Sequence, residues 1–184
     1  GQKPTPAGGG MFKIDHFQKT ENSNIINFPQ IIRYWDKAGT GKDELKKGKK
    51  AAFTVGVKMA RRKDGKFVVL DVKRGQWSTD EREKIIRQTA EADSSIVDIW
   101  IEQEPGSGGK ESAQSTIKNL AGFKINAECP TGDKVYRADP YSVQVNNGNV
   151  LLLNADWNKV FIDEHEFFPN SIYKDQVDAA AGAF

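Results

Sequence analysis

Cysteine and histidine are scarce in this chain. Its 184 residues include one cysteine, Cys129, and two histidines, His16 and His165. A single cysteine excludes an internal disulfide and a Cys-x-x-Cys zinc site, and it fits a reducing compartment. We expect Cys129 to be a small buried side chain. Because the histidines form no HExxH or HxxxH pair, we expect them to pack or to lie at the surface.

Long apolar runs and a dominant charge are also missing. No apolar run approaches the about 18 residues that a membrane span needs. The first ten residues, GQKPTPAGGG, lack the apolar centre of a secretion signal. The formal net charge is only +2, so nucleic-acid binding is suggested only by local basic patches. These patches contain Lys42, Lys46, Lys47, Lys49 and Lys50, and then Arg61, Arg62, Lys63 and Lys66.

Motifs for nucleotide binding and acyl transfer are not found in the sequence. The stretch Gly39-Thr40-Gly41-Lys42 resembles the end of a phosphate loop, but Asp36 stands where the first glycine belongs and Asp43 where the hydroxyl belongs. There is no Gly-x-Ser-x-Gly elbow either. We therefore expect neither an ATP site nor a nucleophilic serine.

The order of apolar patterns predicts one α/β domain. Residues 1–10 are rich in proline and glycine, and we interpret them as a linker that once joined an upstream segment, followed by a domain at 11–184. The predicted fold is a mixed sheet with helices on its faces, in which three antiparallel strands precede parallel ones. The predicted strands are 31–36, 51–60, 67–73, 96–104 and 123–127, and the predicted helices are 78–92, 110–120 and one from 175 onward. Residues 139–148 are ambiguous.

Acidic residues stand at the ends of the predicted elements. Asp36 ends the first strand, Glu102 lies near the end of the fourth, and Asp175 and Asp178 lie three residues apart at the start of the last helix, on one face. Carboxylates brought together in this way suit two Mg²⁺ or Mn²⁺ ions that act on a phosphodiester. Structural roles stay open for each of them, as strand-end or helix caps or as solvent-facing residues, and Glu104 could compete with Glu102.

The residues around these acids resemble the nuclease domain of the large terminases of tailed phages. Residues 33–38 (RYWDKA) are similar to the strand that opens that domain, and residues 99–108 (IWIEQEPGSG) to its second block. Residues 167–179 (FFPNSIYKDQVDA) are similar to its third block, and residues 70–76 (LDVKRGQ) to the segment between the first two. The resemblance runs in order over residues 11–184 and implies a ribonuclease H-like fold, shared with junction resolvases and integrases.

The resemblance also implies a site and an activity. Asp36, Glu102 and Asp175 would be catalytic metal ligands, and Asp178 a fourth ligand or a supporting residue. The implied activity is a two-metal endonuclease that cuts double-stranded, concatemeric phage DNA during genome packaging. Lys174 stands where the family often has a first aspartate, which leaves open whether Asp175 or Asp178 is the main third ligand.

The implied partners are double-stranded DNA, an upstream ATPase motor domain, the small terminase and the portal, without a membrane, in the host cytoplasm. We expect DNA contacts from the basic patches and from a lysine beside the last helix. The residues expected to bind DNA are Lys46, Lys47, Lys49, Lys50, Arg61, Arg62 and Lys174. Two other interpretations remain: a Holliday-junction resolvase of the same fold, and an inert domain that binds DNA or the portal.

Overall fold

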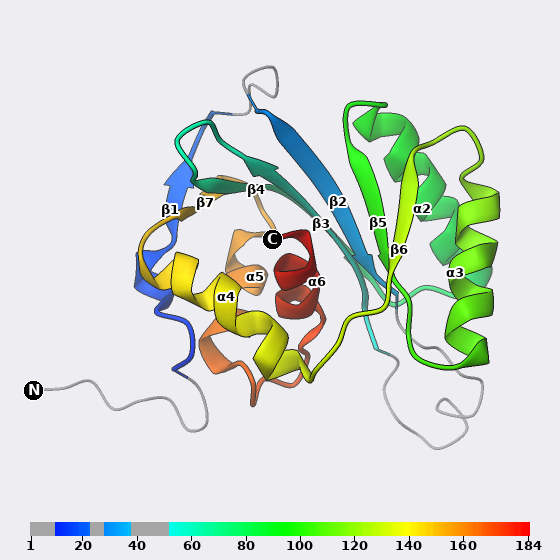
Figure 1. The fold of residues 1–184 in the computed structure, drawn as a ribbon. Coiled ribbons are helices and arrows are strands. Elements are labelled where there is room, and N and C mark those ends of the chain that lie inside the picture. The colour runs from blue at the N-terminus through cyan, green and yellow to red at the C-terminus, as the bar shows by residue number, and fades with distance from the viewer. Residues whose placement is uncertain (1–9, 23–27, 38–51) are drawn as a thin grey trace, which may run out of the picture.

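A seven-stranded mixed sheet forms the centre of the computed structural model, which describes residues 10–22, 28–37 and 52–184 (Figure 1). The spatial order of the strands is β1-β7-β4-β3-β2-β5-β6. Their bounds are Gln18–Thr20 (β1), Gln30–Asp36 (β2), Thr54–Arg61 (β3), Phe67–Gly75 (β4), Asp98–Glu102 (β5), Ile125–Glu128 (β6) and Val150–Leu153 (β7). The pairs β2–β3 and β3–β4 are antiparallel, and the other four neighbouring pairs are parallel. The predicted mixed sheet is confirmed.

Two groups of helices cover the sheet (Figure 1). The helices are a 3₁₀ turn at Ile14–His16 (η1), Thr79–Asp93 (α2), Ser107–Asn119 (α3), Lys134–Asn146 (α4), Asn158–Phe167 (α5) and Asp175–Ala183 (α6). Because side chains alternate along β2, Tyr34 enters the core that contains α4, α5 and α6, whereas Trp35 enters a separate core with α2. None of the helices in the described residues is long and apolar enough to cross a membrane.

Local signals in the sequence explain where several elements begin and end. The hairpin between β3 and β4 turns at Gly65, whose φ is +85°, and Arg62 N–H donates to the Lys66 carbonyl at 2.8 Å. The α2 helix begins as predicted, because the Ser78 hydroxyl accepts from the Glu81 amide at 3.3 Å.

Other elements differ from the prediction. The glycine-rich stretch expected as a loop after β5 supplies the first turn of α3, which begins at Ser107. Helix α4 occupies most of the segment that the sequence left ambiguous. It begins at a cap in which the Asp133 carboxylate accepts from the Tyr136 amide at 2.7 Å, and it contains Pro140, which obscured the helical pattern.

The scarce residues lie in contrasting places. The burial predicted for Cys129 is wrong, since the cysteine is exposed just beyond β6, an edge strand. His165 is completely buried and hydrogen bonds with the Tyr141 hydroxyl at 2.9 Å, so it packs in the core as expected. His16 lies in η1, where its ring contacts the carbonyl of Asn146. Of the predicted linker at residues 1–10, only the last residue belongs to the described part of the chain.

Candidate metal centre

Three carboxylates meet at one edge of the sheet. The parallel neighbours β2 and β5 end side by side, with Trp35 paired with Ile101, so Asp36 and Glu102 follow at the same edge. Helix α6 contacts β2 and β3 and brings Asp178 to this edge. One carboxylate oxygen from each of Asp36, Glu102 and Asp178 lies within 4.8 Å of the other two. Residues 36, 102 and 178 are thus joined by the sheet topology and by the docking of α6.

Two of these carboxylates are buried, Glu102 is partly buried, and all three are incompletely hydrogen bonded. Asp36 is 7% exposed and Asp178 is 6% exposed. Asp36 Oδ2, Glu102 Oε2 and Asp178 Oδ2 accept no hydrogen bond from any residue that the structure describes. A buried oxygen without a donor is costly. Hard divalent cations bind this kind of donor, because they prefer carboxylate oxygens. The residues present therefore fit a hard divalent cation.

The carboxylates also perturb each other electrostatically. Burial raises the pKa of Asp36 well above its usual range, and the charges of Glu102 and Asp178 raise it further. Burial and then the charge of Asp178 raise the pKa of Glu102, although Arg137 opposes this. Like charges crowded in a low-dielectric site favour a bound proton or a bound cation. The arrangement thus favours positively charged ligands.

Two cations from the first turn of α4 border the carboxylates. Lys134 Nζ lies 3.9 Å from Asp36 Oδ2, 3.5 Å from Asp178 Oδ2 and 3.8 Å from Asp175 Oδ1. Arg137 bridges two acids, with Nη1 donating to Glu102 Oε1 at 2.9 Å and Nη2 lying 3.1 Å from Asp178 Oδ1. Four carboxylates face two cations, so the fully ionised site keeps an excess of two negative charges.

Sequence analysis missed both cations. They stand three residues apart at the start of a helix, so they share a face. The available signal was the spacing of Lys134 and Arg137 behind the capping residue Asp133, but no helix was assigned to that segment. Burial alone would lower the pKa of Lys134, yet the surrounding carboxylates, Asp36 foremost, raise it overall, so the ammonium stays charged.

The other predicted acids lie around the triad. Asp175 is the first residue of α6, and the 4.8 Å group does not include it. Burial raises the pKa of Asp175, while Lys134 and a hydrogen bond from the Phe53 backbone lower it. Glu104 is exposed beyond the end of β5. The geometry thus groups Asp178, ranked below Asp175 on sequence grounds, with Asp36 and Glu102.

The predicted DNA-binding residues are dispersed. Lys46, Lys47, Lys49 and Lys50 lie outside the described residues. Arg61 pairs in register with Gln30, at the opposite end of β2 from Asp36, about 20 Å away at roughly 3.3 Å per residue. Arg62 forms an ion pair with Asp64 at 2.8 Å. Lys174 is exposed at the start of α6, beside the site.

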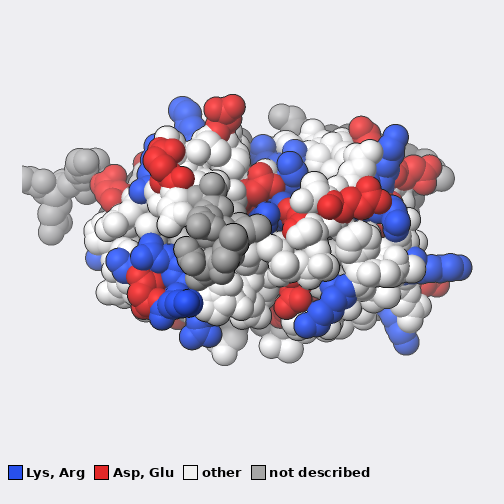
Figure 2. Space-filling model, turned by 90° about the horizontal axis from the view of Figure 1, so that it is seen from above, with Lys and Arg blue, Asp and Glu red and all other residues white. Residues whose placement is uncertain are grey.

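The surface seen from above in Figure 1 shows basic and acidic side chains interspersed among uncharged ones (Figure 2). Among the described residues on this face, the basic side chains form no single continuous surface.

The family model described as the Terminase RNaseH-like domain matches residues 33–184. The chain belongs to this family. The match includes all four acids and both α4 cations of the site. No curated protein matches the sequence of this terminase domain.

Solved structures with the same fold cover nearly the whole terminase domain. The human cytomegalovirus terminase nuclease domain, Mn soaked and inhibitor bound, is 12% identical with a TM-score of 0.63, over 95% of this chain and 93% of that one. The large terminase nuclease of thermophilic phage G20c with bound magnesium is 13% identical with a TM-score of 0.63, over 97% of each chain. The fowlpox virus Holliday junction resolvase is 10% identical with a TM-score of 0.51, over 84% of this chain and 94% of that one. These similarities support the ribonuclease H-like fold.

Proposed function

We propose that this terminase domain is a metal-dependent endonuclease that cleaves double-stranded DNA, and that Asp36, Glu102 and Asp178 hold the metal. The observation that carries the proposal is the convergence of two buried carboxylates and one partly buried carboxylate, each with one oxygen within 4.8 Å of the others and each with an oxygen that accepts no hydrogen bond from the described residues. Relatives of the same fold support it, because one structure contains magnesium and another was soaked in Mn.

The acidic residues of the site would have two roles. Asp36, Glu102 and Asp178 would bind two Mg²⁺ or Mn²⁺ ions. When bound, such ions stabilise the charge that develops on phosphate oxygens and lower the pKa of water. Asp175 would act beside the triad as a further ligand or through Lys134, from which its Oδ1 lies 3.8 Å.

Lys134 and Arg137 would serve the reaction as fixed positive charges. Both are held by the carboxylates before DNA arrives, so their positions require little reorganisation. A phosphate that approaches the triad would meet the ammonium and the guanidinium as well as the metal. The negatively charged DNA backbone would then lie among cations despite the acidic character of the site.

We further propose that the substrate is concatemeric phage DNA, cut during genome packaging in the host cytoplasm. The proposed partners are an ATPase motor domain, the small terminase and the portal. Family membership supports this setting. The basic residues Arg61, Arg62 and Lys174 and the lysines at 46, 47, 49 and 50 remain candidates for phosphate contacts, which position DNA without reading its sequence.

Incubation of supercoiled plasmid with Mn²⁺, Mg²⁺ or EDTA tests the proposed activity. We expect nicking and linearisation with either metal and none with the chelator. Undiminished cutting in excess EDTA would refute the metal mechanism. Intact plasmid under every condition, with DNA binding retained, would favour an inert binding domain. A strong preference for a four-way junction over linear duplex would favour a resolvase, the function of the fowlpox relative.

A further inference from the structure

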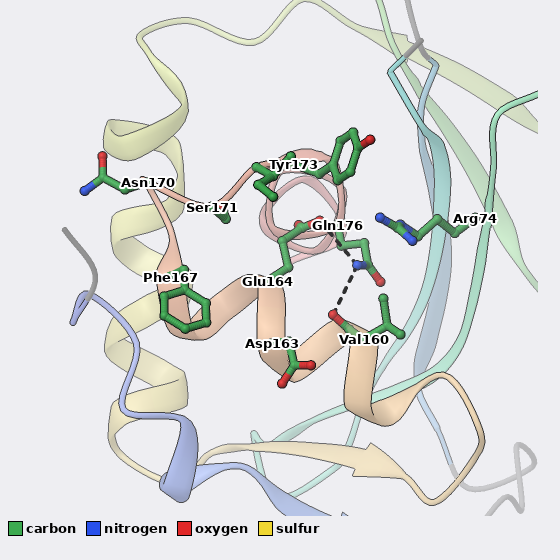
Figure 3. Close-up of a pocket in the computed structure, with 10 residues that line it drawn as sticks. Arg74, Val160, Asp163, Glu164, Phe167, Asn170, Ser171, Tyr173 and Gln176 are labelled. Atoms are coloured by element: carbon green, nitrogen blue, oxygen red, sulfur yellow. Dashed lines mark hydrogen bonds between the residues drawn. The ribbon is translucent and has the colours of Figure 1, made fainter. Parts of the chain in front are cut away.

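The start of α6 is anchored by a side chain from another helix. The first amides of a helix need acceptors from outside it, and Lys174, which precedes α6, provides no side-chain cap. Glu164 of α5 accepts from one of these amides and from a side chain of the same turn. Its Oε2 accepts from the Val177 amide at 2.7 Å, and its Oε1 accepts from Gln176 Nε2 at 3.2 Å. Figure 3 shows Glu164 pointing from α5 to Gln176 at the first turn of α6.

The anchored turn is the one that carries the acids of the proposed metal site. Val177 directly precedes Asp178 and follows Asp175 by two residues, so the bond to its amide fixes the rotation of both acids about the helix axis. The opposite end of α6 is fixed by close approach, since a Cβ on Gly182 would lie 2.4 Å from the Tyr34 ring. Glu164 therefore restrains the backbone at the acidic end of the helix, where Lys134 and Arg137 contact the acidic side chains themselves.

The carboxylate of Glu164 is buried, and its burial is energetically unfavourable. Glu164 is 7% exposed. In the described part of the chain, no lysine or arginine nitrogen lies within 4.0 Å of its carboxylate oxygens, so it forms no ion pair there. Burial raises its pKa to about 7, although the Val177 amide and Gln176 lower it. A carboxylate at this depth without an ion pair costs free energy even with Arg74 across the cavity, which favours a specific task over general packing.

We propose that Glu164 is a positioning residue, which caps the first turn of α6 from α5, holds Asp178 beside Asp36 and Glu102, and so sets the affinity of the site for a divalent metal. The inference rests on the proposed function. It adds a residue of α5 that touches none of the three carboxylates and acts on them through the backbone of α6.

Substitution of Glu164 by a smaller residue enlarges an existing cavity and does not create a new one in the core. The side chain lines a cavity of about 370 Å³ between α5, α6 and Arg74 (Figure 3). Glu164→Ala removes both acceptors. Glu164→Gln keeps one acceptor oxygen for the Val177 amide. Asp163→Asn is the matched control, because Asp163 lines the same cavity but pairs with Lys159 of its own helix.

The test measures Mn²⁺ binding by calorimetry and amide hydrogen exchange across residues 174–184. We expect Glu164→Ala to weaken Mn²⁺ binding by about 10-fold to 100-fold, the range for groups that orient metal ligands, and to accelerate exchange at Val177. Glu164→Gln should retain most of the affinity and protection, and Asp163→Asn should match the wild type.

Wild-type affinity in Glu164→Ala would overturn the inference. So would an equal loss in Glu164→Gln, because the shared acceptor oxygen would then not be the cause. If the wild type itself binds no Mn²⁺, the proposed function fails. The hydrogen-exchange data then test separately whether Glu164 caps α6. Faster exchange in Glu164→Ala alone would retain Glu164 as the anchor of α6, and unchanged exchange would reject it.

Discussion

Two buried charge clusters flank the same strand on opposite faces of the sheet, and they differ in charge balance. In the first, Arg33 of β2 donates to both carboxylate oxygens of Asp93 at 2.9 Å and to Asp71 at 2.8 Å. Lys58 lies 3.3 Å from Asp93 and Lys73 lies 3.7 Å from Asp71, so no acid in this cluster is without a cation. Burial alone would raise the pKa of Asp93, but the hydrogen bonds and charge of Arg33 hold it below its usual value.

The second cluster, around Asp36, is unbalanced. Its acids outnumber its cations, burial and like charges raise the pKa of Asp36 and Glu102, and three of its oxygens lack donors among the described residues. Both clusters are buried, so burial does not distinguish them. A cluster in which every acid is paired with a cation fits a structural role, whereas an acidic cluster with free oxygens fits a ligand site.

Asp36→Asn gives the sharpest test of that contrast. We expect DNA cleavage to fall below detection, because the variant removes a carboxylate from the centre of the triad. The free energy of unfolding should hold or rise slightly, since like-charge repulsion is relieved. Plasmid cleavage and urea denaturation measure the two effects. Asp64→Asn, in the exposed hairpin, is the control, and wild-type cleavage by Asp36→Asn would reduce Asp36 to a structural residue.

Arg33→Met should have the reverse effect. It leaves Asp93 and Asp71 without their main partner, and breaking a buried pair in this way costs about 3–5 kcal/mol. We expect urea denaturation to show that loss, with Arg61→Met, an exposed arginine on the neighbouring strand, within about 0.5 kcal/mol of the wild type. A small change in Arg33→Met would mean that the cluster around Arg33 contributes little to stability.

A comparison of Asp178→Asn with Asp175→Asn separates the two acids of α6. The geometry favours Asp178 as the third ligand, the reverse of the order expected from the sequence. We expect cleavage by Asp178→Asn to be undetectable and cleavage by Asp175→Asn to fall by about 10-fold to 100-fold, as for residues that support a ligand. If the two losses are exchanged, Asp175 is the main ligand and α6 must shift when metal binds.

A further expectation concerns the pH dependence of stability. The pKa of Glu164 is raised from 4.5 to about 7 by burial, so the folded state holds its proton more tightly, and stability falls as pH rises between these values. Arg74 and Asp175 face Glu164 and influence the same pKa. Relative to Glu164→Gln, the wild type should lose up to about 3 kcal/mol between pH 4.5 and 7. A pH-independent difference between the two proteins would show that the Glu164 pKa is ordinary.

The sequence predicted the elements whose signals are local. Alternating apolar residues predicted β3 and β4, the Asp64-Gly65 pair predicted their turn, and Ser78 predicted the start of α2. Strand ends also placed Asp36 and Glu102 correctly at the edges of β2 and β5.

The third member of the triad and the partners of Arg33 could not be predicted from the sequence, because both depend on tertiary contacts. Whether Asp175 or Asp178 joins the triad depends on the rotation of α6, which is held by Glu164 and Gly182 from distant segments. The role of Arg33 was hidden because its partners Asp71 and Asp93 come from other elements. Charge balance is therefore visible only once the fold is assembled.

The candidate site draws its members from almost the whole length of the chain, with Asp36 near one end, Asp178 near the other, and Glu102 and Lys134 between them. Such non-local contacts form late in folding, after the cost of closing long loops has been met. During synthesis, a ribosome-bound chain that has been made only as far as α5 holds two of the three carboxylates and lacks the third. If the proposed function is right, such a chain lacks one metal ligand, and we expect cleavage only after α6 has docked.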